Sequence, residues 1–441
     1  MLYKEEGKPH FGNLESLVQH YRLCPAILLY HHVMFRILPL SSGLRVLALL
    51  LSTINFSSAL PHHSQRLTRD GVPLPRLDKR ATASDYVAYA VAGIDQMQTW
   101  YDAATGLWSS AWWNSANAIT VMADFQEYFP SMVDSITAQV FPTTLAKAPS
   151  SSGNTGFING FYDDELWWVL AWIKVFDVTG DTQYLDTASS IFEDAKSAWG
   201  SSPCGGLWVR PLPSTPSLID CMINTWQWDK AHTSVGAVEN ELYLTAAAKL
   251  ANRKPDLPSG GYYFNEAIKA YDWFIGSGLI NSDNLINNGL VLSTCKNDGN
   301  LVFTYNQGIL LSGLAELAWA TGNNSYNDLA NTLALAGIAQ LTDANGILHE
   351  PCEATGCDGD EEQFKGVFGR NIQFLYNRAT NLPETTAEKY KSFLQVNANA
   401  IWADDQVNNQ LGLVWSGPAG TATIQTQSSA LDAIVGAACV S

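Results

Sequence analysis

Basic side chains and histidine are scarce in this chain of 441 residues. Lysine and arginine number 25 against 42 aspartate and glutamate residues, which gives a formal net charge of −17. A nucleic-acid-binding surface needs a basic face, so nucleic acid is excluded as a partner. Only two of the eight histidines, His232 and His349, follow residue 80. A zinc site with three histidine ligands cannot form there, and a Ser-His-Asp triad has two candidate bases, neither near a Gly-x-Ser-x-Gly motif.

A hydrophobic run long enough for a confident membrane span is also missing. The mostly apolar stretch at residues 46–60 has 15 residues and is preceded by Arg45, a pattern typical of a secretory signal. We therefore predict a signal peptide over residues 34–59, with residues 1–33 as an unusual leader or an over-extended start. A signal anchor that begins at Met1 is the alternative.

Residues 60–80 are polar and contain proline, and they end in the dibasic pair Lys79-Arg80. This composition predicts a pro-segment with a processing site, or alternatively a linker, before a folded region over 81–441. The mildly apolar C-terminal segment, residues 428–441, does not resemble a lipid-anchor tail. We expect a secreted or cell-wall protein without a confident membrane anchor, and we expect a monomer.

Six of the seven cysteines lie beyond the predicted signal, and an even number behind a signal suggests disulfides. Closeness in sequence favours the pairs Cys352–Cys357 and Cys204–Cys221, which leaves Cys295 with Cys439. No Cys-x-x-Cys pair occurs, so the sequence predicts no zinc knuckle, and we expect no metal site. Asn323 begins a glycosylation sequon, which fits secretion.

Apolar residues at three- and four-residue spacing dominate the region after residue 80 and predict one all-α domain of about twelve helices in a toroidal or two-layer arrangement. Alternating strand patterns are scarce, although residues 286–304 and 204–210 are candidates for short hairpins. The clearest helical segments are 84–100, 115–129, 163–178, 184–198, 233–251, 263–276, 305–320, 326–341 and 363–379.

Aromatic side chains are abundant, with 15 tryptophans, 17 tyrosines and 17 phenylalanines. Core packing accounts for part of them. Sugar rings have apolar faces that stack on aromatic planes, and their hydroxyl groups need acidic and amide partners. A tryptophan-rich, acidic, histidine-poor chain is therefore typical of a protein that processes or binds carbohydrate.

Three consecutive acids, Asp163, Asp164 and Glu165, precede a strongly apolar predicted helix. Acids are favoured at a helix N-terminus, which explains one or two of them without any catalytic role. Two carboxylates about 5–5.5 Å apart would also match a retaining glycosidase, because inverting enzymes need about 6.5–9.5 Å to admit a water. Close like charges push two pKa values apart, so one acid can attack the anomeric carbon while the other protonates the leaving oxygen.

The residues around this pair form a longer motif, Tyr162-Asp163-Asp164-x-x-Trp167-Trp168. Three further motifs occur along the chain: Trp112-Trp113-Asn114-x-x-Asn117, Tyr305-Asn306-Gln307-Gly308, and a late segment from Glu350 to Arg370 that holds Cys352, Cys357, Asp358, Asp360, Phe364-Lys365-Gly366 and Phe368. In order and spacing they resemble the glycoside hydrolases of family 76, the endo-α-1,6-mannanases, including their fungal cell-wall members. The resemblance spans roughly residues 100–380.

This resemblance implies an (α/α)6 barrel, a single catalytic domain and retaining cleavage of α-1,6-linked mannan without a cofactor. Carried over by position, Asp163 is the nucleophile and Asp164 the acid/base. The residues expected to bind substrate are Trp113, Asn117, Tyr162, Trp168, Tyr305, Asn306, Gln307, Lys365, Phe368 and Arg370.

Structural roles are the alternatives at several of these positions. Tyr305 to Gln307 open a helix and can cap it, and Lys365 and Arg370 can form salt bridges to the acidic run at 358–362. That run lacks the spacing of an EF-hand calcium loop.

The sequence therefore predicts retaining endo-hydrolysis of α-1,6-mannosidic bonds in mannan or mannoprotein glycans. The first alternative is a cell-wall transglycosidase that joins mannoprotein glycans to wall glucan. The second is a catalytically silent mannan-binding protein.

Overall fold

The structure is a computed structural model that describes residues 81–151, 156–208, 234–255 and 261–441. The predictions for residues 1–33, 34–59 and 60–80, and for Cys221 and His232, fall outside these ranges. The described residues belong to one compact unit. Among them, no helix is both long and apolar enough to cross a membrane.

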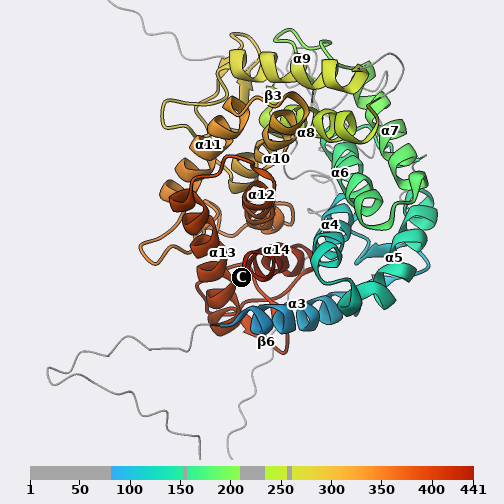
Figure 1. Ribbon diagram of the computed structural model, residues 1–441, viewed down its shortest axis with the longest axis vertical. Coiled ribbons are helices and arrows are strands. Elements are labelled where there is room, and N and C mark those ends of the chain that lie inside the picture. Colours follow the sequence, from blue (N-terminus) through green and yellow to red (C-terminus); the bar gives the residue numbers. More distant parts are fainter. Residues whose placement is uncertain (1–80, 152–155, 209–233, 256–260) are drawn as a thin grey trace, which may run out of the picture. The chain divides into compact units, whose positions relative to one another are not determined.

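Twelve α-helices in the described residues form two concentric rings (Figure 1). The inner helices are α4 (Trp112–Tyr128), α6 (Tyr162–Thr179), α8 (Ala237–Arg253), α10 (Thr304–Thr321), α12 (Phe364–Arg378) and α14 (Ile424–Val440). The outer helices are α3 (Ala83–Gln98), α5 (Pro130–Ser151), α7 (Thr182–Ser197), α9 (Tyr262–Ser277), α11 (Ser325–Leu341) and α13 (Glu384–Asp404). Each inner helix packs against the next, and α14 closes the ring against α4. The expected all-α (α/α)6 toroid is confirmed.

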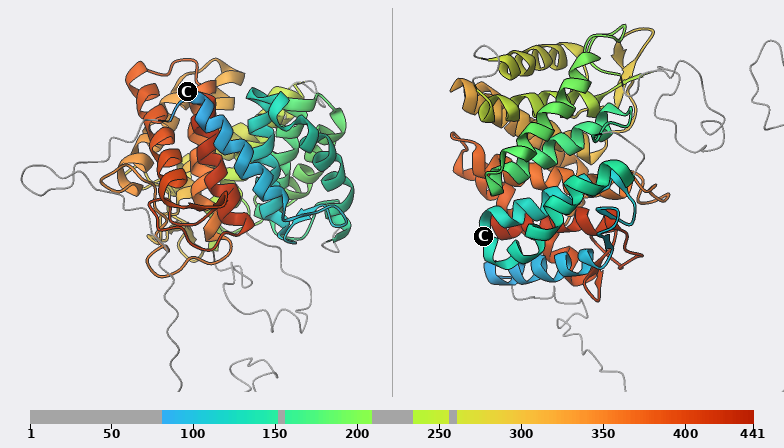
Figure 2. Two further views of the ribbon diagram at one scale, coloured as in Figure 1. Left: turned by 90° about the horizontal axis from the view of Figure 1, so that it is seen from below. Right: turned by 90° about the vertical axis from the view of Figure 1, so that its right-hand side faces the viewer.

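Side-chain patterning decides which helices lie inside. The inner helix α10 is buried continuously from Thr304 to Ala318, as expected for a helix that packs on all sides. The outer helix α7 buries one face, from Tyr184 and Leu185 to Ala195, and exposes the other. Inner and outer helices alternate along the chain, so the inner six run in the same direction and their N-termini gather at one end of the ring. The side views in Figure 2 show the inner and outer helices lying alongside one another.

Three helices were not among the segments with the clearest periodicity. Helix α5 contains Pro142 and Pro149, and proline normally argues against a helix interior. Helix α14 is rich in small residues and is buried on almost every side, so it has little amphipathic contrast. The segment at 428–441 is therefore part of the inner ring. Helix α13 extends from Glu384 to Asp404.

Short antiparallel strands occur in the connections. These are β1 (Tyr101–Asp102) with β2 (Leu107–Trp108), β3 (Ser234–Gly236) with β4 (Gly289–Val291) and β5 (Lys296–Asn297), and β6 (Gln406–Val407) with β7 (Gln410–Leu411). The β4–β5 pair confirms the predicted hairpin within 286–304. No strand forms at residues 204–208, the described part of the other candidate. Because β3 pairs with β4, helix α8 begins at Ala237 instead of 233.

The disulfides correct one predicted pairing. Cys352–Cys357 is confirmed, but Cys204 pairs with Cys295, at a Cα–Cα distance of 5.3 Å. Cys439 is a free thiol. Cys295 lies in the turn of the β4–β5 hairpin, which folding carries to the loop after α7. Cys439 lies in the last turn of α14, at the other end of the ring from that hairpin.

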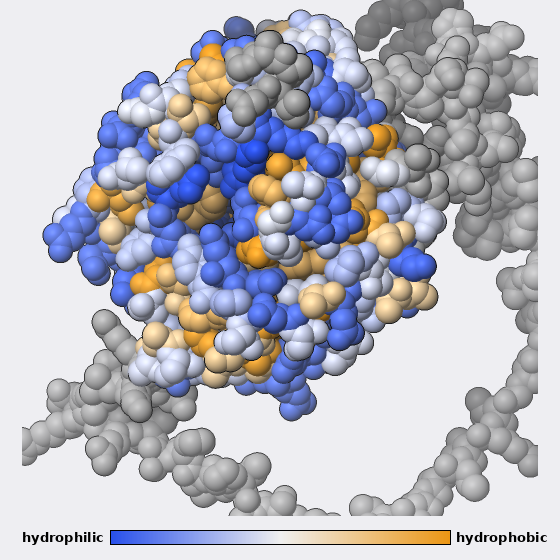
Figure 3. All heavy atoms as spheres, turned by 45° about the vertical axis from the view of Figure 1, so that its right-hand side comes forward, coloured by the Kyte–Doolittle hydropathy of each residue, from blue (hydrophilic) through white to orange (hydrophobic). Residues whose placement is uncertain are grey.

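Hydrophilic residues dominate the surface in the space-filling view of Figure 3, and hydrophobic side chains appear in its central hollow. One hydrophobic core cluster joins the inner and outer helices and their connections, and its larger fully buried side chains include Trp108, Trp168, Trp172 and Trp415. Structural packing therefore uses several of the tryptophans that the composition assigned to carbohydrate. Others remain at the end of the ring where the inner helices begin.

Candidate active site

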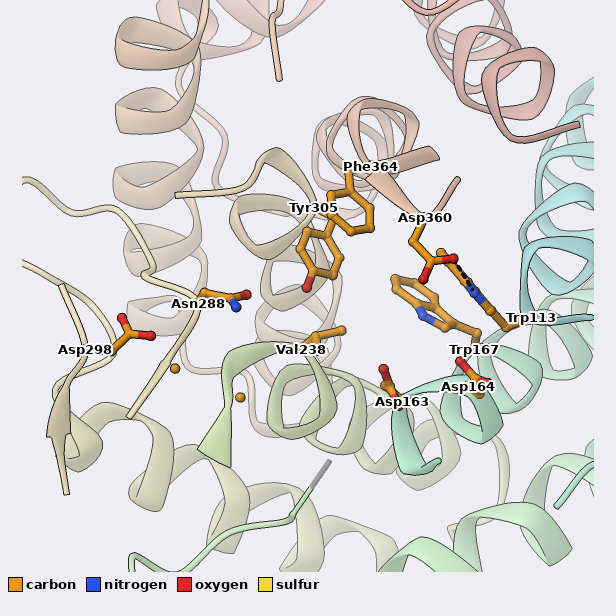
Figure 4. A pocket seen from close by; sticks show the side chains of 12 residues that line it. Trp113, Asp163, Asp164, Trp167, Val238, Asn288, Asp298, Tyr305, Asp360 and Phe364 are labelled. Carbon is orange, nitrogen blue, oxygen red and sulfur yellow. Dashed lines mark hydrogen bonds between the residues drawn. The ribbon is translucent and has the colours of Figure 1, made fainter. Parts of the chain in front are cut away.

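A pocket that is partly open to solvent lies at the N-terminal ends of the inner helices (Figure 4). Its walls come from five of these six helices and from the connections before them. The lining residues are Trp113, Asp163, Asp164, Trp167, Gly236, Val238, Asn288, Gly289, Asp298, Tyr305, Asp360 and Phe364. Four carboxyl groups and four aromatic rings therefore border one space.

The start of α6 separates the roles of the three consecutive acids. Oε1 of Glu165 accepts hydrogen bonds from the backbone N–H groups of Asn159 (2.9 Å) and Gly160 (2.8 Å). Gly160 has φ of 83°, a left-handed conformation that glycine adopts readily. Glu165 is fully buried, and burial raises its pKa to about 8. Glu165 thus fixes the loop before α6, and this leaves Asp163 and Asp164 facing the pocket.

Asp163 and Asp164 have different surroundings. Oδ1 of Asp163 is buried and has no hydrogen-bond partner in the described part of the chain. Burial raises the pKa of Asp163 to about 6. Oδ2 of Asp164 accepts a hydrogen bond from Nδ2 of Asn159 at 2.7 Å. The pKa of Asp164 is raised well above its ordinary value, because burial and then the charge of Asp163 oppose its ionisation.

A third carboxyl group, Asp360, approaches this pair from the segment before α12. Its Oδ1 accepts a hydrogen bond from Nε1 of Trp113 at 3.0 Å. The rings of Trp113 and Trp167 are stacked, with centroids 5.9 Å apart. The charge of Asp360 also raises the pKa of both Asp163 and Asp164. Asp360 belongs to the late motif, but it was interpreted only as part of an acidic run.

Tyr305 forms the opposite wall. Its ring is stacked on that of Phe364, with centroids 3.8 Å apart and an interplanar angle of 11°. In Figure 4 its hydroxyl group points toward the centre of the pocket. The buried Glu350 fixes the start of this helix by accepting the backbone N–H of Thr304 at 3.0 Å. The wall is therefore held by contacts between α10, α12 and the segment between α11 and α12.

The far end of the pocket was not predicted. Asn288 and Asp298 flank the β4–β5 hairpin, and Val238 lies in the first turn of α8. Figure 4 shows Asn288 and Asp298 on one side of Asp163 and Trp113 on the other. The only signal in the sequence was a polar hairpin rich in asparagine and aspartate. Its position beside the aspartate pair depends on the pairing of β3 with β4.

Two further residues near the pocket have buried side-chain oxygen atoms without a hydrogen-bond partner among the described residues. Neither carboxylate oxygen of Glu241, on the second turn of α8, has a hydrogen-bond partner among the described residues, and Oδ1 of Asn306 also lacks one. Burial, then the charge of Glu239, raises the pKa of Glu241 well above its usual range. Buried polar groups are normally satisfied, so these atoms are available to a water or a ligand.

Of the twelve residues predicted for the site, Trp113, Asp163, Asp164 and Tyr305 line the pocket. Tyr162 is buried, and burial raises its pKa to about 12. Trp168 is fully buried and stacks on Trp172, with centroids 5.6 Å apart. Both side chains lie in the packing around the start of α6.

The remaining polar predictions lie behind the pocket wall. Nε2 of Gln307 donates a hydrogen bond to the backbone oxygen of Ile286 at 2.9 Å, and Oε1 of Gln307 accepts one from the backbone N–H of Ile286 at 2.8 Å. Asn306 donates to Oδ1 of Asn288 at 3.4 Å. Asn117 donates to the side chain of Gln363 at 3.2 Å. These amides position the connections that carry lining residues.

Lys365, Phe368 and Arg370 also lie outside this pocket. Lys365 bonds the Glu353 carboxylate and donates to the backbone oxygen of Leu413 at 2.6 Å. Arg370 pairs with Asp432 at 3.3 Å and donates to Asn117. Phe368 is fully buried. The alternative that Lys365 and Arg370 pair with the acidic run at 358–362 is wrong, because both side chains point to other acids.

That acidic run caps its own turn. Oδ1 of Asp358 accepts the backbone N–H groups of Asp360 (3.0 Å) and Glu361 (2.9 Å), and Glu362 accepts the hydroxyl of Thr423 at 2.7 Å. Among the described residues, one group, Cys352, Cys357 and Glu361, has metal-ligand spacing. Its two cysteines are joined in a disulfide and offer no thiolate.

The double ring and the acidic, aromatic-lined pocket at its N-terminal end define an (α/α)6 toroid suited to carbohydrate. The chain belongs to glycosyl hydrolase family 76, whose family model matches residues 81–440.

Individual relatives are distant in sequence. The mannan endo-1,6-alpha-mannosidases DFG5 and DCW1 of Saccharomyces cerevisiae are 23% and 25% identical, over 66% and 65% of this chain. The alignments span 64% and 62% of those proteins, which is less than two thirds of their length.

Solved structures share the fold. The GH76A α-1,6-mannanase of Salegentibacter is 22% identical, with a TM-score of 0.66 over 81% of this chain and 100% of that one. Dfg5 of Chaetomium thermophilum, in complex with glucosamine, is 17% identical, with a TM-score of 0.67 over 82% of this chain and 92% of that one. An inactive variant of the Salegentibacter enzyme, with two consecutive aspartates replaced by alanine, is in complex with α-1,6-mannotetrose.

Proposed function

We propose that this protein is a retaining endo-α-1,6-mannanase. The observation that carries the proposal is the Asp163–Asp164 pair, which opens α6 at the floor of an aromatic-lined pocket. Retaining glycosidases hold their two carboxyl groups only about 5–5.5 Å apart, and consecutive residues at a helix start bring two carboxyl groups close to each other. The two consecutive aspartates removed from the inactive Salegentibacter mannanase support the same pair.

The different surroundings of the pair support a division of roles between them. Asp163 has the lower pKa, about 6, and an unpartnered oxygen, so its carboxylate attacks the anomeric carbon. Asp164 keeps its proton more strongly and gives it to the leaving glycosidic oxygen. The mannosyl–Asp163 ester then reacts with water, whose proton returns to Asp164 as the ester bond breaks. Each aspartate thereby recovers its starting protonation state.

The remaining walls suit a chain of sugars. The stacked pairs Trp113–Trp167 and Tyr305–Phe364 offer apolar faces on two sides. Asn288 and Asp298 extend the pocket beyond Asp163, on the side away from Trp113 (Figure 4). Sugar units on both sides of the aspartate pair are what cleavage inside a polymer requires. We therefore propose internal bonds of α-1,6-mannan as the substrate.

Incubation with unbranched α-1,6-mannan, with and without an oligomannoside acceptor, tests this function by mass spectrometry of the products. We expect short oligomannosides without acceptor. Lengthened acceptors with little free product would instead establish a transglycosidase. Binding of mannan without any product would identify a mannan-binding protein, in which the two aspartates only stabilise the helix N-terminus.

The pH profile of kcat/KM should have two limbs. The nucleophile must be ionised, so the rate is expected to fall about tenfold per pH unit below pH ~6, where Asp163 gains its proton. At higher pH the rate should fall again, because Asp164 loses the proton that it must donate to the leaving oxygen. Initial rates on mannan across the pH range measure both. A rate that stays constant from pH ~6 down to pH ~4 would contradict the assignment of Asp163.

A further inference from the structure

A second cavity, partly open to solvent, lies inside the ring toward the C-terminal ends of the inner helices. Its walls include Thr120, Lys174, Lys249, Ser312, Arg370 and Phe374. Trp167 lines both this cavity and the candidate active site, so the two spaces share one wall residue. The cavity faces the opposite end of the ring from the aspartate pair.

Its charge is opposite to that of the chain. Three lining side chains, Lys174, Lys249 and Arg370, are cationic and one, Asp124, is anionic, although the protein carries a net charge of −17. Cations near the C-terminal ends of helices compensate the helix dipoles, which is a structural reason for some of them. Dipole compensation does not explain why the cationic groups of three different helices converge on one cavity.

Two of these cations are already neutralised. Lys174 lies 2.7 Å from Asp124 and 2.6 Å from Glu127. Arg370 pairs with Asp432 at 3.3 Å. The ammonium of Lys174 has three N–H donors, so one remains after those two contacts.

Lys249 has no such partner. Its Nζ makes no hydrogen bond or ion pair with the described residues and lies 3.8 Å from the centroid of the Phe374 ring. The charged groups around it are Glu316 on α10, Arg253 on its own helix, and Asp177 and Lys174 on α6.

Both neighbouring acids are occupied. Arg253 bonds Asp177 at 2.6 Å and Glu316 at 3.2 Å. Lys249 is half-buried, and this burial lowers its pKa to about 8, so its charged form carries an energetic cost there. An anion in the cavity would remove that cost.

We propose that this cavity binds a small oxyanion, a phosphate or carboxylate group, between Lys249 and Lys174. The third N–H of Lys174 and the three N–H groups of Lys249 supply charge-assisted hydrogen bonds. Among the described residues, the hydroxyl group of Ser312 makes only a long bond, 3.4 Å to the backbone oxygen of Ile309, and it can turn to the ligand. Mannan itself is neutral, so this site is distinct from the proposed substrate pocket and does not depend on the proposed function.

Calorimetric titration of the secreted protein near neutral pH, where Lys249 is protonated, tests the site directly. The probes are inorganic phosphate, citrate, mannose 6-phosphate and, as the uncharged counterpart, mannose. We expect binding of at least one anion and none of mannose at this site. Phosphate, citrate and the sugar phosphate together distinguish a free phosphate, a carboxylate and a phosphate carried on a sugar. No heat with any anion would overturn the proposal.

The matched variants are Lys249→Met and Lys389→Met. Loss of the charge-assisted contacts of Lys249 is expected to weaken anion binding at least about tenfold. Lys389 is exposed on the outer helix α13, and its replacement removes the same charge without changing the dissociation constant. Equal affinities for the wild type and Lys249→Met would also refute the site.

Thermal unfolding separates a ligand site from a structural role. Without added anion, Lys249→Met should unfold at the same temperature as the wild type or higher, because an unpaired, half-buried cation is gone. Phosphate should raise the melting temperature of the wild type and of Lys389→Met, but not that of Lys249→Met. If Lys249→Met does not fold, Lys249 is a structural residue and the proposal is wrong.

Discussion

Replacing Asp163 with asparagine is expected to abolish turnover of α-1,6-mannan, with a loss of at least about a thousandfold in kcat/KM. An amide cannot form the glycosyl ester, and the pocket contains no second group on the same turn of α6 that is equally free to attack. The far-ultraviolet circular dichroism spectrum should be unchanged, because the buried Oδ1 of this side chain has no hydrogen-bond partner among the described residues. Rates on mannan and the spectrum measure both effects.

Replacing Asp164 with asparagine should give a comparable loss on mannan for a different reason. The leaving sugar oxygen then departs without a proton, so a mannoside with a strongly acidic leaving group should be cleaved with much less loss. The control is Asp186→Asn, which alters an exposed carboxylate paired with Lys254 and should leave the rate unchanged. Full activity of either Asp163→Asn or Asp164→Asn on mannan would discard the assignment.

Asp163→Asn should also stabilise the protein at pH above ~6. The folded-state pKa, about 6, exceeds the ordinary value of 3.8, so the folded protein binds this proton more tightly than the unfolded chain does. The wild type therefore loses stability as the pH rises through that interval, whereas the amide does not. The difference in melting temperature should vanish below pH ~4, where the carboxyl group is protonated in both states.

Replacing Gly308 with alanine is expected to destabilise the fold by about 3 kcal/mol. A Cβ atom there would lie 2.7 Å from Cα of Phe368 and 2.8 Å from the backbone oxygen of Val367. Both obstacles are backbone atoms of α12, so the two inner helices would have to separate. Tyr305 lies one turn before Gly308, and the same shift would move a wall of the pocket.

Thermal and denaturant unfolding measure this effect, and Gly276→Ala is the matched control. A Cβ at Gly276, in the outer helix α9, meets no atom within 4 Å. That substitution should stabilise the protein by ~0.5–1 kcal/mol, because alanine is the better helix former. A melting temperature of Gly308→Ala equal to that of the wild type would show that α10 and α12 do not approach so closely.

Local chemistry explains why the sequence predicted so much of the fold. Each amphipathic helix carries its own periodicity, so segments such as 163–178 and 184–198 were recognised without reference to the rest of the chain. The all-α class followed from that recurrence, and the family resemblance added the ring. The acids at 163 and 164 were found because their spacing along one helix start is fixed by the helix itself.

Contacts between distant segments were decided by tertiary structure alone. Asn288 and Asp298 reach the pocket because β3 pairs with β4. Cys295 reaches Cys204 through the turn of the same hairpin.

Side-chain direction also depended on tertiary structure. Lys365 and Arg370 contact Glu353 and Asp432, which no local pattern specifies. The unpaired Lys249 became visible only once α8 faced Phe374 across the ring. Helical periodicity acts over a few residues, whereas closing the ring sets which side chains, tens to hundreds of residues apart, share a cavity, and only the folded chain supplies that information.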